Sequence, residues 1–180
     1  MDKITTFINS YLPLASSIEK KYGMPALAIL AQSALETGWG INKPGNMMFG
    51  IKAGSSWTGK TQKLLTTEIL TADQVKKLKS YHSITRLDSG KYNVKLYQDF
   101  RAYDSPRESF EDYAGLISGN QRYQAALQQS DPYAYASAIA KAGYATATNY
   151  YDAIKSIIDT IKKKVVLKRG SRSQPEPAYS

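Results

Sequence analysis

The chain contains no cysteine and only one histidine, His82, among its 180 residues. Without cysteine, it cannot form a disulfide framework, a thiolate zinc site, an iron–sulfur cluster or a cysteine nucleophile. One histidine cannot supply a three-histidine zinc site or an H-E-x-x-H pair, so most zinc-dependent hydrolase chemistry is excluded. If the protein is an enzyme, its catalytic groups are expected to be carboxylates. Nothing in the sequence calls for a metal or another cofactor.

Long hydrophobic segments are also absent. No stretch of the sequence approaches the roughly 20 apolar residues that span a bilayer. The first six residues, MDKITT, have no apolar core and no small-residue cleavage pattern, so we expect neither a secretory signal there nor a membrane partner. The length suits one compact domain, or one domain with a small lobe, because such a chain can bury an ordinary core.

The net charge is +9, and residues 162–180 contribute +5 of it, from six cations and one anion. Beyond Lys168, the segment RGSRSQPEPAYS has too little apolar surface to fold. We therefore predict a monomeric folded domain over residues 1–164 and a basic, disordered tail over residues 165–180. The tail either binds anionic wall polymers or simply aids solubility. Charge concentrated in a tail argues against nucleic acid, for which a basic stripe on a folded helix is expected.

Hydrophobic residues recur at steps of three and four along much of the chain, which predicts a mainly helical protein. The predicted helices run from about Ile4 to Gly23, Met24 to Gly38, Ser105 to Ile117, Asp131 to Ala142 and Asn149 to Lys164. Ser105 and Glu108 form a capping-box pattern with Pro106 at the first helical position. Glycine or a capping residue marks most of these boundaries.

A small β-lobe is predicted at about residues 60–100, between the helices. Residues 63–70 and 92–97 show strand patterns and are expected to pair as a hairpin, with a short surface helix within residues 71–81. Residues 40–61 are rich in Gly, Asn, Ser and Pro, which indicates a long ordered loop of the kind that is usually functional. The fold class is therefore α+β, mainly α.

Glu36 is unusual because it lies in the last turn of the second predicted helix. The helix dipole is negative there, and an exposed carboxylate is disfavoured by about 0.3–1 kcal/mol. Burial beside the apolar stripe and the dipole would both raise the pKa of this carboxyl. A carboxyl with a raised pKa keeps its proton near neutral pH and can act as a general acid. The alternative is a surface glutamate that reaches solvent past Gly38.

Four sequence blocks occur in a fixed order: AILAQSALETGWG at 28–40, NMMFGIKAGSSW at 46–57, FRAYDSPRESFEDYAGLI at 100–117 and KAGYATATNYYDAI at 141–154. Together they resemble the glucosaminidase family of peptidoglycan hydrolases, glycoside hydrolase family 73, over about residues 5–162. The resemblance implies a lysozyme-like fold with a glycan cleft between a helical lobe and a β-lobe. It also implies endo-acting cleavage, at the bacterial cell wall, of the β-1,4 bond after N-acetylglucosamine in peptidoglycan.

The resemblance assigns the general acid to Glu36. Glycoside hydrolysis usually needs a second carboxylate, and Glu68, in LLTTEIL, matches the family's candidate on the hairpin. A solvent-facing strand residue is the alternative reading of Glu68, and Asp99 is the reserve candidate. The acetamido group of the substrate could also replace the second carboxylate. Retaining, inverting and substrate-assisted mechanisms therefore remain open.

Tyr144, in AGYAT, matches the family's functional tyrosine, whose hydroxyl would orient Glu36 or the substrate. A tyrosine that packs in the core after the end of a helix is the alternative. The family pattern continues with Asp-Pro, whereas this chain has Ala147 and Thr148 there. This departure puts the local geometry in doubt more than the chemistry, because Thr148 or Asn149 can cap the last helix instead.

Five further residues are expected to bind the glycan. Asn46 could hydrogen-bond an acetamido group, Phe49 could line the floor of the cleft, and Trp57 could stack on a sugar face. Trp39 is a second stacking candidate, although it suits the core better, and Tyr150 completes the set. A packing role in the loop is equally open for Asn46 and Phe49.

Two other functions remain open at this point. A muramidase or lytic transglycosylase would cut the other linkage of the same polymer, because a fold does not fix a reaction. A non-catalytic module for anionic polymers would use the positive charge alone. The sequence also leaves open whether the protein is a phage lysin or a cellular autolysin.

Overall fold

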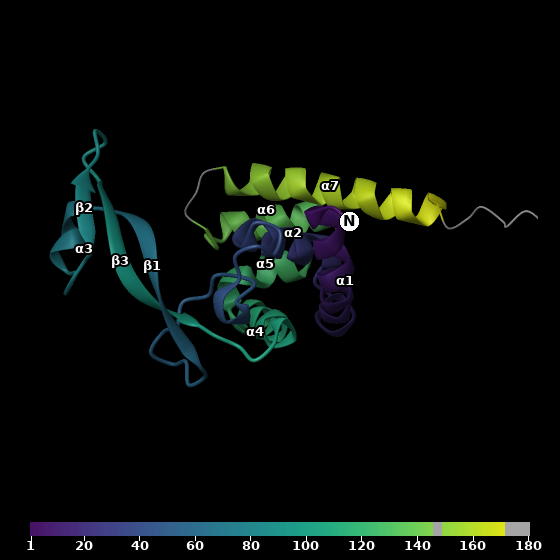
Figure 1. The fold of residues 1–180 in the computed structure, drawn as a ribbon, viewed down its shortest axis with the longest axis horizontal. Helices are drawn as coiled ribbons and strands as arrows, with labels where there is room; N and C mark the ends of the chain where they lie inside the picture. Colours follow the sequence, from purple (N-terminus) through teal and green to yellow (C-terminus); the bar gives the residue numbers. More distant parts are fainter. Residues whose placement is uncertain (146–148, 172–180) are drawn as a thin grey trace, which may run out of the picture.

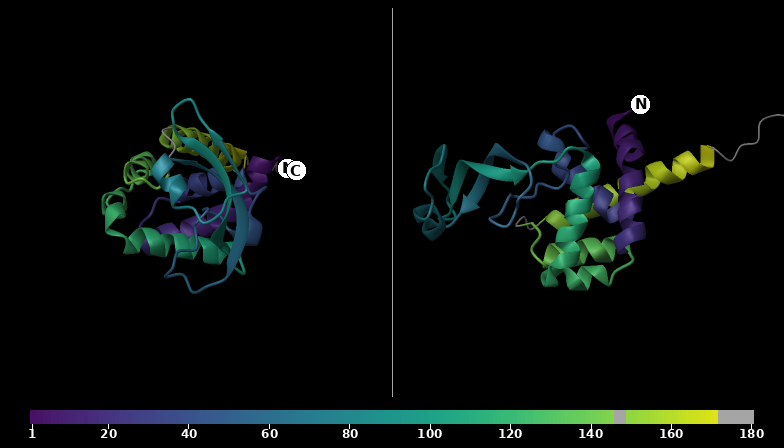
Figure 2. Two further views of the ribbon diagram at one scale, coloured as in Figure 1. Left: turned by 90° about the vertical axis from the view of Figure 1, so that its left-hand side faces the viewer. Right: turned by 90° about the horizontal axis from the view of Figure 1, so that it is seen from below.

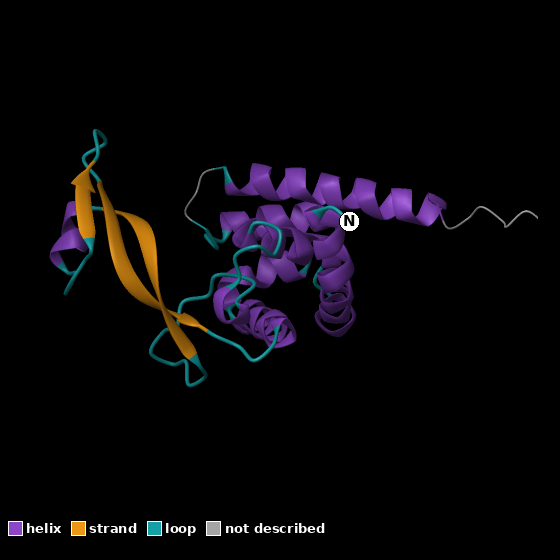
Figure 3. Ribbon diagram, viewed as in Figure 1, coloured by secondary structure: helices purple, strands orange, loops and turns teal. Residues whose placement is uncertain are grey.

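The computed structural model describes residues 1–145 and 149–171 and consists of a helical lobe and a sheet lobe (Figures 1 and 3). The helical lobe contains α1 (Lys3–Tyr22), α2 (Ala26–Thr37), η1 (Pro44–Asn46), α4 (Pro106–Gly119), η2 (Gln121–Tyr123), α5 (Gln124–Leu127), α6 (Pro132–Lys141) and α7 (Tyr150–Ser171). The sheet lobe contains β1 (Thr61–Leu70), α3 (Ala72–Lys76), β2 (Ser83–Arg86) and β3 (Tyr92–Arg101). The mainly helical α+β class predicted from the periodicity is confirmed.

Helix α2 forms the centre of the helical lobe. Most of its residues are buried, and α1, α6 and α7 pack around it. This burial follows from its sequence, ALAILAQSALET, which is apolar on nearly every face. The helix ends where Gly38 adopts a left-handed conformation, with φ of 56°. The last turn of α2 is thereby held in place by packing on several sides.

The sheet lobe is antiparallel, with strand order β1-β3-β2. Strands β1 and β3 pair along their whole length, from Thr61 opposite Arg101 to Leu70 opposite Tyr92. Exposed and half-buried residues alternate along β1, as expected of a strand with one covered face. Figure 2 shows the sheet projecting from one side of the helical lobe, with α3 and β2 at the end away from the helices.

Some elements differ from the sequence-based expectation. Strand β2, helix α5 and turn η2 were not predicted, because each spans too few residues to show a periodic pattern. Helix α7 continues past the predicted end at Lys164 as far as Ser171. Val165 packs against the core and Lys164 pairs with Asp2 at 3.2 Å, which helps to keep this last part helical. Residues 172–180 of the predicted tail lie outside the described residues, as do Ala147 and Thr148.

The predicted capping box at the start of α4 forms only in part. The Ser105 side chain accepts a hydrogen bond from the Glu108 N–H at 3.4 Å, as expected. The Glu108 carboxylate accepts from the N–H of Asp104 at 3.1 Å, one residue before the expected donor. The two bonds thus satisfy the N–H groups of Glu108 and Asp104.

The part of the chain that the structure describes has neither a membrane-spanning helix nor a cluster of metal-ligating side chains. None of the helices found there is long and apolar enough to cross a membrane. Within the same residues, no group of three or more histidine, aspartate or glutamate side chains is placed to hold a metal ion.

Candidate active site

Glu36 faces a glycine in the long loop after α2. Gly50 has φ of +60°, and a Cβ atom built on it would lie 3.1 Å from Oε2 of Glu36. Any larger residue would therefore press on the carboxyl, and its backbone would be strained in this left-handed conformation. Glycine at position 50 thus allows the loop backbone to approach Glu36 closely.

The Glu36 carboxyl has an unusual protonation equilibrium. By surface area Glu36 is an exposed residue at the end of α2, yet protein atoms crowd around its carboxyl closely enough to desolvate it. This desolvation raises its pKa to about 7 from an ordinary value of 4.5. The direction agrees with the expectation from the helix end. A carboxyl of this kind is half protonated at neutral pH and can donate its proton to a substrate.

Tyr144 is held next to the same loop. Its hydroxyl donates a hydrogen bond to the carbonyl oxygen of Phe49 at 3.1 Å, and Phe49 directly precedes Gly50. Burial raises the pKa of the Tyr144 hydroxyl well above its ordinary value, and the nearby Glu36 raises it further. Tyr144 is therefore a neutral hydrogen-bond donor at physiological pH. Tyr144 and Glu36 therefore both lie next to the Phe49–Gly50 segment.

A buried hydrogen-bonded chain lies one helical turn before Glu36. Gln32 of α2 is 1% exposed, and its Oε1 accepts from the hydroxyl of Tyr113 in α4. Its Nε2 donates to the hydroxyl of Tyr150 in α7 at 3.0 Å. The hydroxyls of Tyr113 and Tyr135 are 3.1 Å apart. Because Tyr113 gives its one proton to Gln32, Tyr135 is the donor to Tyr113. This chain fixes α2, α4, α6 and α7 against one another beneath Glu36.

No role for Gln32, Tyr113 or Tyr135 was predicted from the sequence. The available signal was a polar residue in the middle of an otherwise apolar, buried helix, because a buried amide needs hydrogen-bond partners. Tyr150, predicted to bind the glycan, is 5% exposed and belongs to this chain. Its placement favours a structural role for the ring.

Glu68 lies on the half-buried face of β1, with 27% of its side chain exposed. Its Oε1 accepts from Nζ of Lys52 at 2.8 Å. Lys52 follows Gly50 by two residues, which span at most about 7 Å. Gly50, which faces Glu36, and Lys52, which pairs with Glu68, therefore lie close together in one loop. Among the described residues, however, no hydrogen bond joins Glu68 to Glu36 or Tyr144.

The reserve carboxylate is less well placed. Asp99 of β3 has 55% of its side chain exposed and pairs with Lys63 at 3.5 Å. The ion pair connects neighbouring strands on the exposed face of the sheet, since Lys63 and Asp99 are directly opposite in the register. This position favours a surface role.

Three of the predicted binding residues have structural contacts. Phe49 is 2% exposed, and its ring stacks on Tyr113 with the centroids 4.2 Å apart. Trp39 packs its ring edge-on against Phe7 at 5.6 Å. Asn46 donates from Nδ2 to the Tyr103 carbonyl oxygen at 3.0 Å. For Phe49 this favours the packing alternative, because a substrate cannot stack on a ring that is already covered. Trp39 is half-buried and packs against the core.

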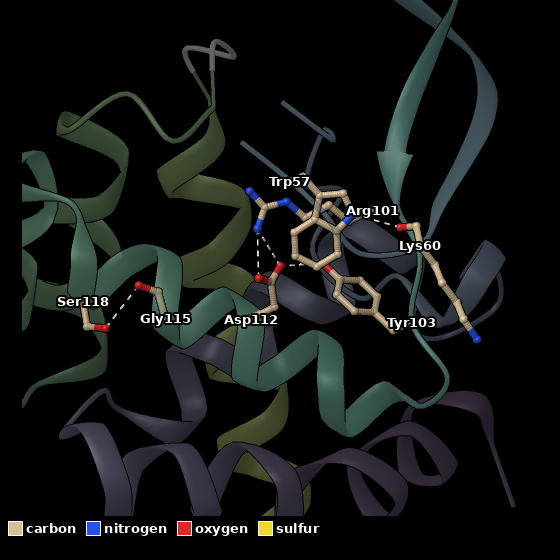
Figure 4. Close-up of polar contacts among 7 residues, drawn as sticks. All are labelled: Trp57, Lys60, Arg101, Tyr103, Asp112, Gly115 and Ser118. Atoms are coloured by element: carbon tan, nitrogen blue, oxygen red, sulfur yellow. Dashed lines mark hydrogen bonds and ion pairs between the residues drawn. The ribbon is translucent and has the colours of Figure 1, made fainter. Parts of the chain in front are cut away.

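Trp57 belongs to a cluster that connects the sheet to α4 (Figure 4). The Arg101 guanidinium lies 4.4 Å from the centre of the Trp57 ring, and the indole Nε1 donates to the Lys60 carbonyl at 3.0 Å. Arg101 Nη1 donates to both Asp112 oxygens at 2.8 and 2.9 Å, and the Tyr103 hydroxyl donates to Oδ2 at 2.7 Å. One face of Trp57 is thus occupied by Arg101, and the cluster forms the joint between the two lobes.

Comparisons with known proteins agree with this arrangement. The family model of the glucosaminidases, described as mannosyl-glycoprotein endo-beta-N-acetylglucosaminidase, matches residues 12–163. The peptidoglycan hydrolase FlgJ of Pseudomonas aeruginosa is 36% identical over 152 residues, which are 80% of this chain and 33% of that protein. The chain spans a third to about half the length of the curated relatives that it matches.

Solved structures share the fold. The glycoside hydrolase domain of Salmonella typhimurium FlgJ has a TM-score of 0.71 at 28% identity, covering 96% of each chain. A peptidoglycan hydrolase mutant from Sphingomonas sp. A1 has a TM-score of 0.71 at 32% identity, covering 89% of this chain and 97% of that one. With the family model matching most of the folded residues and two such domains sharing its lysozyme-like fold, the chain belongs to the glucosaminidase family of glycoside hydrolases.

Proposed function

We propose that the protein is an endo-acting β-N-acetylglucosaminidase that cleaves the β-1,4 bond after N-acetylglucosamine in peptidoglycan. The observation that carries the proposal is the Glu36 carboxyl, which has a pKa of about 7 and faces the glycine at position 50. Family membership supports the reaction class, and the relatives named as peptidoglycan hydrolases support the polymer.

In the proposed reaction, Glu36 donates its proton to the glycosidic oxygen as the bond from that oxygen to C1 breaks. Positive charge then develops at C1, and a water molecule adds there. Glu68 accepts a proton from this water. Its Oε2 makes no hydrogen bond among the described residues and is therefore available to bind the water. Glu36 ends ionised and Glu68 ends protonated, so proton exchange with solvent restores both. Tyr144, whose hydroxyl donates to the Phe49 carbonyl, holds the loop segment next to Glu36 in place.

Reducing-end analysis of digested peptidoglycan tests this proposal. We expect new N-acetylglucosamine reducing ends from the wild type and none above background from Glu36→Gln. A fall in mean glycan-strand length early in the digest would support endo cleavage, and release of single terminal sugars would contradict it. Muramic acid or anhydro ends would instead support a muramidase or a lytic transglycosylase. No new ends from either protein would support a binding module.

We also propose that the protein acts at the cell wall as a monomer, without a nucleic-acid or membrane partner. The cations in the second half of α7, Lys162 to Lys164, would bind anionic wall polymers together with those further along the sequence. The route by which the protein reaches the wall stays open.

A methyl group at position 50 is expected to lower the hydrolysis rate about tenfold. The new Cβ would lie 3.1 Å from Oε2 of Glu36, which is closer than ordinary van der Waals contact, so the carboxyl must shift by a few tenths of an ångström. Small displacements of a reacting group are costly, since 1 Å can cost about 100-fold in rate. The measurement is kcat of Gly50→Ala on purified glycan fragments.

Gly23→Ala is the matched control for this variant. Gly23 has a similar positive φ of +74°, and a Cβ there would meet nothing within 4 Å. Both variants carry the same left-handed penalty of about 1–2 kcal/mol. We therefore expect both to lose thermal stability and only Gly50→Ala to lose rate. Equal rates in the two variants would show that the contact with Glu36 has no influence on catalysis.

A further inference from the structure

The backbone that leads into Tyr144 forms a complete Schellman turn at the end of α6. The N–H of Gly143 donates to the carbonyl of Ala140 at 2.9 Å, and the N–H of Tyr144 donates to the carbonyl of Ile139 at 3.3 Å. Gly143 has φ of +78°, as this turn requires. These two bonds use the carbonyl groups of Ala140 and Ile139, which leaves those of Ala142 and Gly143 for other donors.

Arg122 binds both of these carbonyl groups. Its Nε and Nη2 donate to the Ala142 oxygen at 2.9 and 2.6 Å, and Nη2 also donates to the Gly143 oxygen at 2.7 Å. A planar guanidinium can hold two neighbouring oxygens in one fixed geometry, which a lysine ammonium cannot do. The positive charge also suits the negative end of α6. The peptide units just before Tyr144 are therefore clamped from outside.

The neighbour of Arg122 contacts the Tyr144 ring itself. The ring centroids of Tyr123 and Tyr144 are 6.2 Å apart, and the Arg122 guanidinium lies 5.0 Å from the centre of the Tyr123 ring. The turn that carries both residues is fixed by Asn120, whose Oδ1 accepts from the Arg122 N–H at 3.1 Å. Backbone and ring of Tyr144 are thus held by two consecutive residues of η2.

We propose that Arg122 is a positioning residue. It holds Tyr144 in place by binding the carbonyl groups of Ala142 and Gly143. The inference rests on the proposed function, in which the Tyr144 hydroxyl lies beside Glu36. Arg122 does not reach the Phe49 carbonyl or Glu36 by any hydrogen bond in the described residues, so it acts only through the turn. Nothing in the sequence pattern singles it out, because its partners are backbone atoms 20 and 21 residues away.

The test is a kinetic double-mutant cycle on purified glycan fragments. We expect Arg122→Gln to lower kcat about tenfold with KM nearly unchanged, because a displaced Tyr144 affects the transition state more than binding. Arg122→Lys keeps the charge but loses the planar guanidinium that binds both oxygens at once, so it is expected to recover only part of the rate. Tyr144→Phe should also lower kcat, and Arg122→Gln combined with Tyr144→Phe should be no slower than Tyr144→Phe alone.

Arg107→Gln is the matched control. Arg107 is an exposed arginine of α4, and its replacement removes the same charge without touching the turn after α6. It should keep the wild-type kcat, and circular dichroism should show that all variants are folded. A wild-type kcat in Arg122→Gln or in Tyr144→Phe, or losses that multiply in the double variant, would overturn the proposal. Failure of the proposed function would instead appear as a wild type that produces no N-acetylglucosamine ends.

Discussion

Replacing Glu36 with glutamine is expected to lower the rate of glycan hydrolysis by about 100- to 10,000-fold, the usual contribution of a positioned general acid. Glutamine has almost the same shape as glutamate but has no proton of suitable pKa to give. The contact with Gly50 is preserved, so the loss reports chemistry rather than packing. Initial rates on purified glycan fragments are the measurement. Glu111→Gln is the control, because the half-buried Glu111 binds only Lys21 and Tyr22 of α1 among the described residues, so its replacement should keep the wild-type rate.

The pH dependence of the wild-type rate gives the same prediction a second readout. The acid acts only while it is protonated, and its pKa is about 7. We therefore expect kcat/KM to fall tenfold for each pH unit well above 7, and to lose no acid function between pH 7 and pH 5. A falling limb centred near pH 4.5, the ordinary value for a glutamate, would contradict the role of desolvation at Glu36.

The pH dependence of protein stability should report the raised pKa of Glu36 without any substrate. Between pH 4.5 and 7, the folded state keeps a proton on Glu36 that the unfolded chain has released, so this group favours folding at low pH and loses its contribution as pH rises through 7. Glu36→Gln has no such dependence. We expect Tm of the variant minus Tm of the wild type to grow from pH 4.5 to pH 7 and to be constant above pH 8. A difference independent of pH would argue for an ordinary pKa.

Replacing Glu68 with glutamine is expected to cost about 100-fold or more in rate, the range for a catalytic base. Glu68 is the carboxylate that Lys52 holds at 2.8 Å, and Lys52 is separated by one residue from the glycine at Glu36. Glutamine keeps a hydrogen bond to Lys52 but cannot accept the proton of the attacking water. The rate is measured on the same glycan fragments, with product ends analysed to confirm the linkage.

Asp99→Asn is the matched control for Glu68. Asp99 is also a sheet carboxylate paired with a lysine, but it is more exposed, so it should keep nearly full activity. A large loss in Asp99→Asn with none in Glu68→Gln would move the second carboxylate to the reserve candidate. Full activity in both variants, with Glu36→Gln inactive, would favour attack by the acetamido oxygen of the substrate on C1.

The sequence by itself determined the local elements. Apolar residues at a helical spacing, a capping serine and glycines at the helix ends placed α1, α2, α4 and α6 close to their observed bounds, because these signals act between residues a few positions apart. The same local information placed Glu36 in the last turn of α2, where a carboxylate is electrostatically disfavoured. Short elements such as β2 carry too few residues for such a signal.

Only the tertiary structure decided which side chains meet. It buried Phe49 in the core, packed the half-buried Trp39 against Phe7, paired Glu68 with Lys52, and gave Gln32 its tyrosine partners. Each of these contacts joins residues that are at least 16 positions apart in the sequence. The reason is physical: periodicity and capping report the conformation of a segment, whereas a partner across the fold is fixed by how several segments pack and which polar groups they bury together.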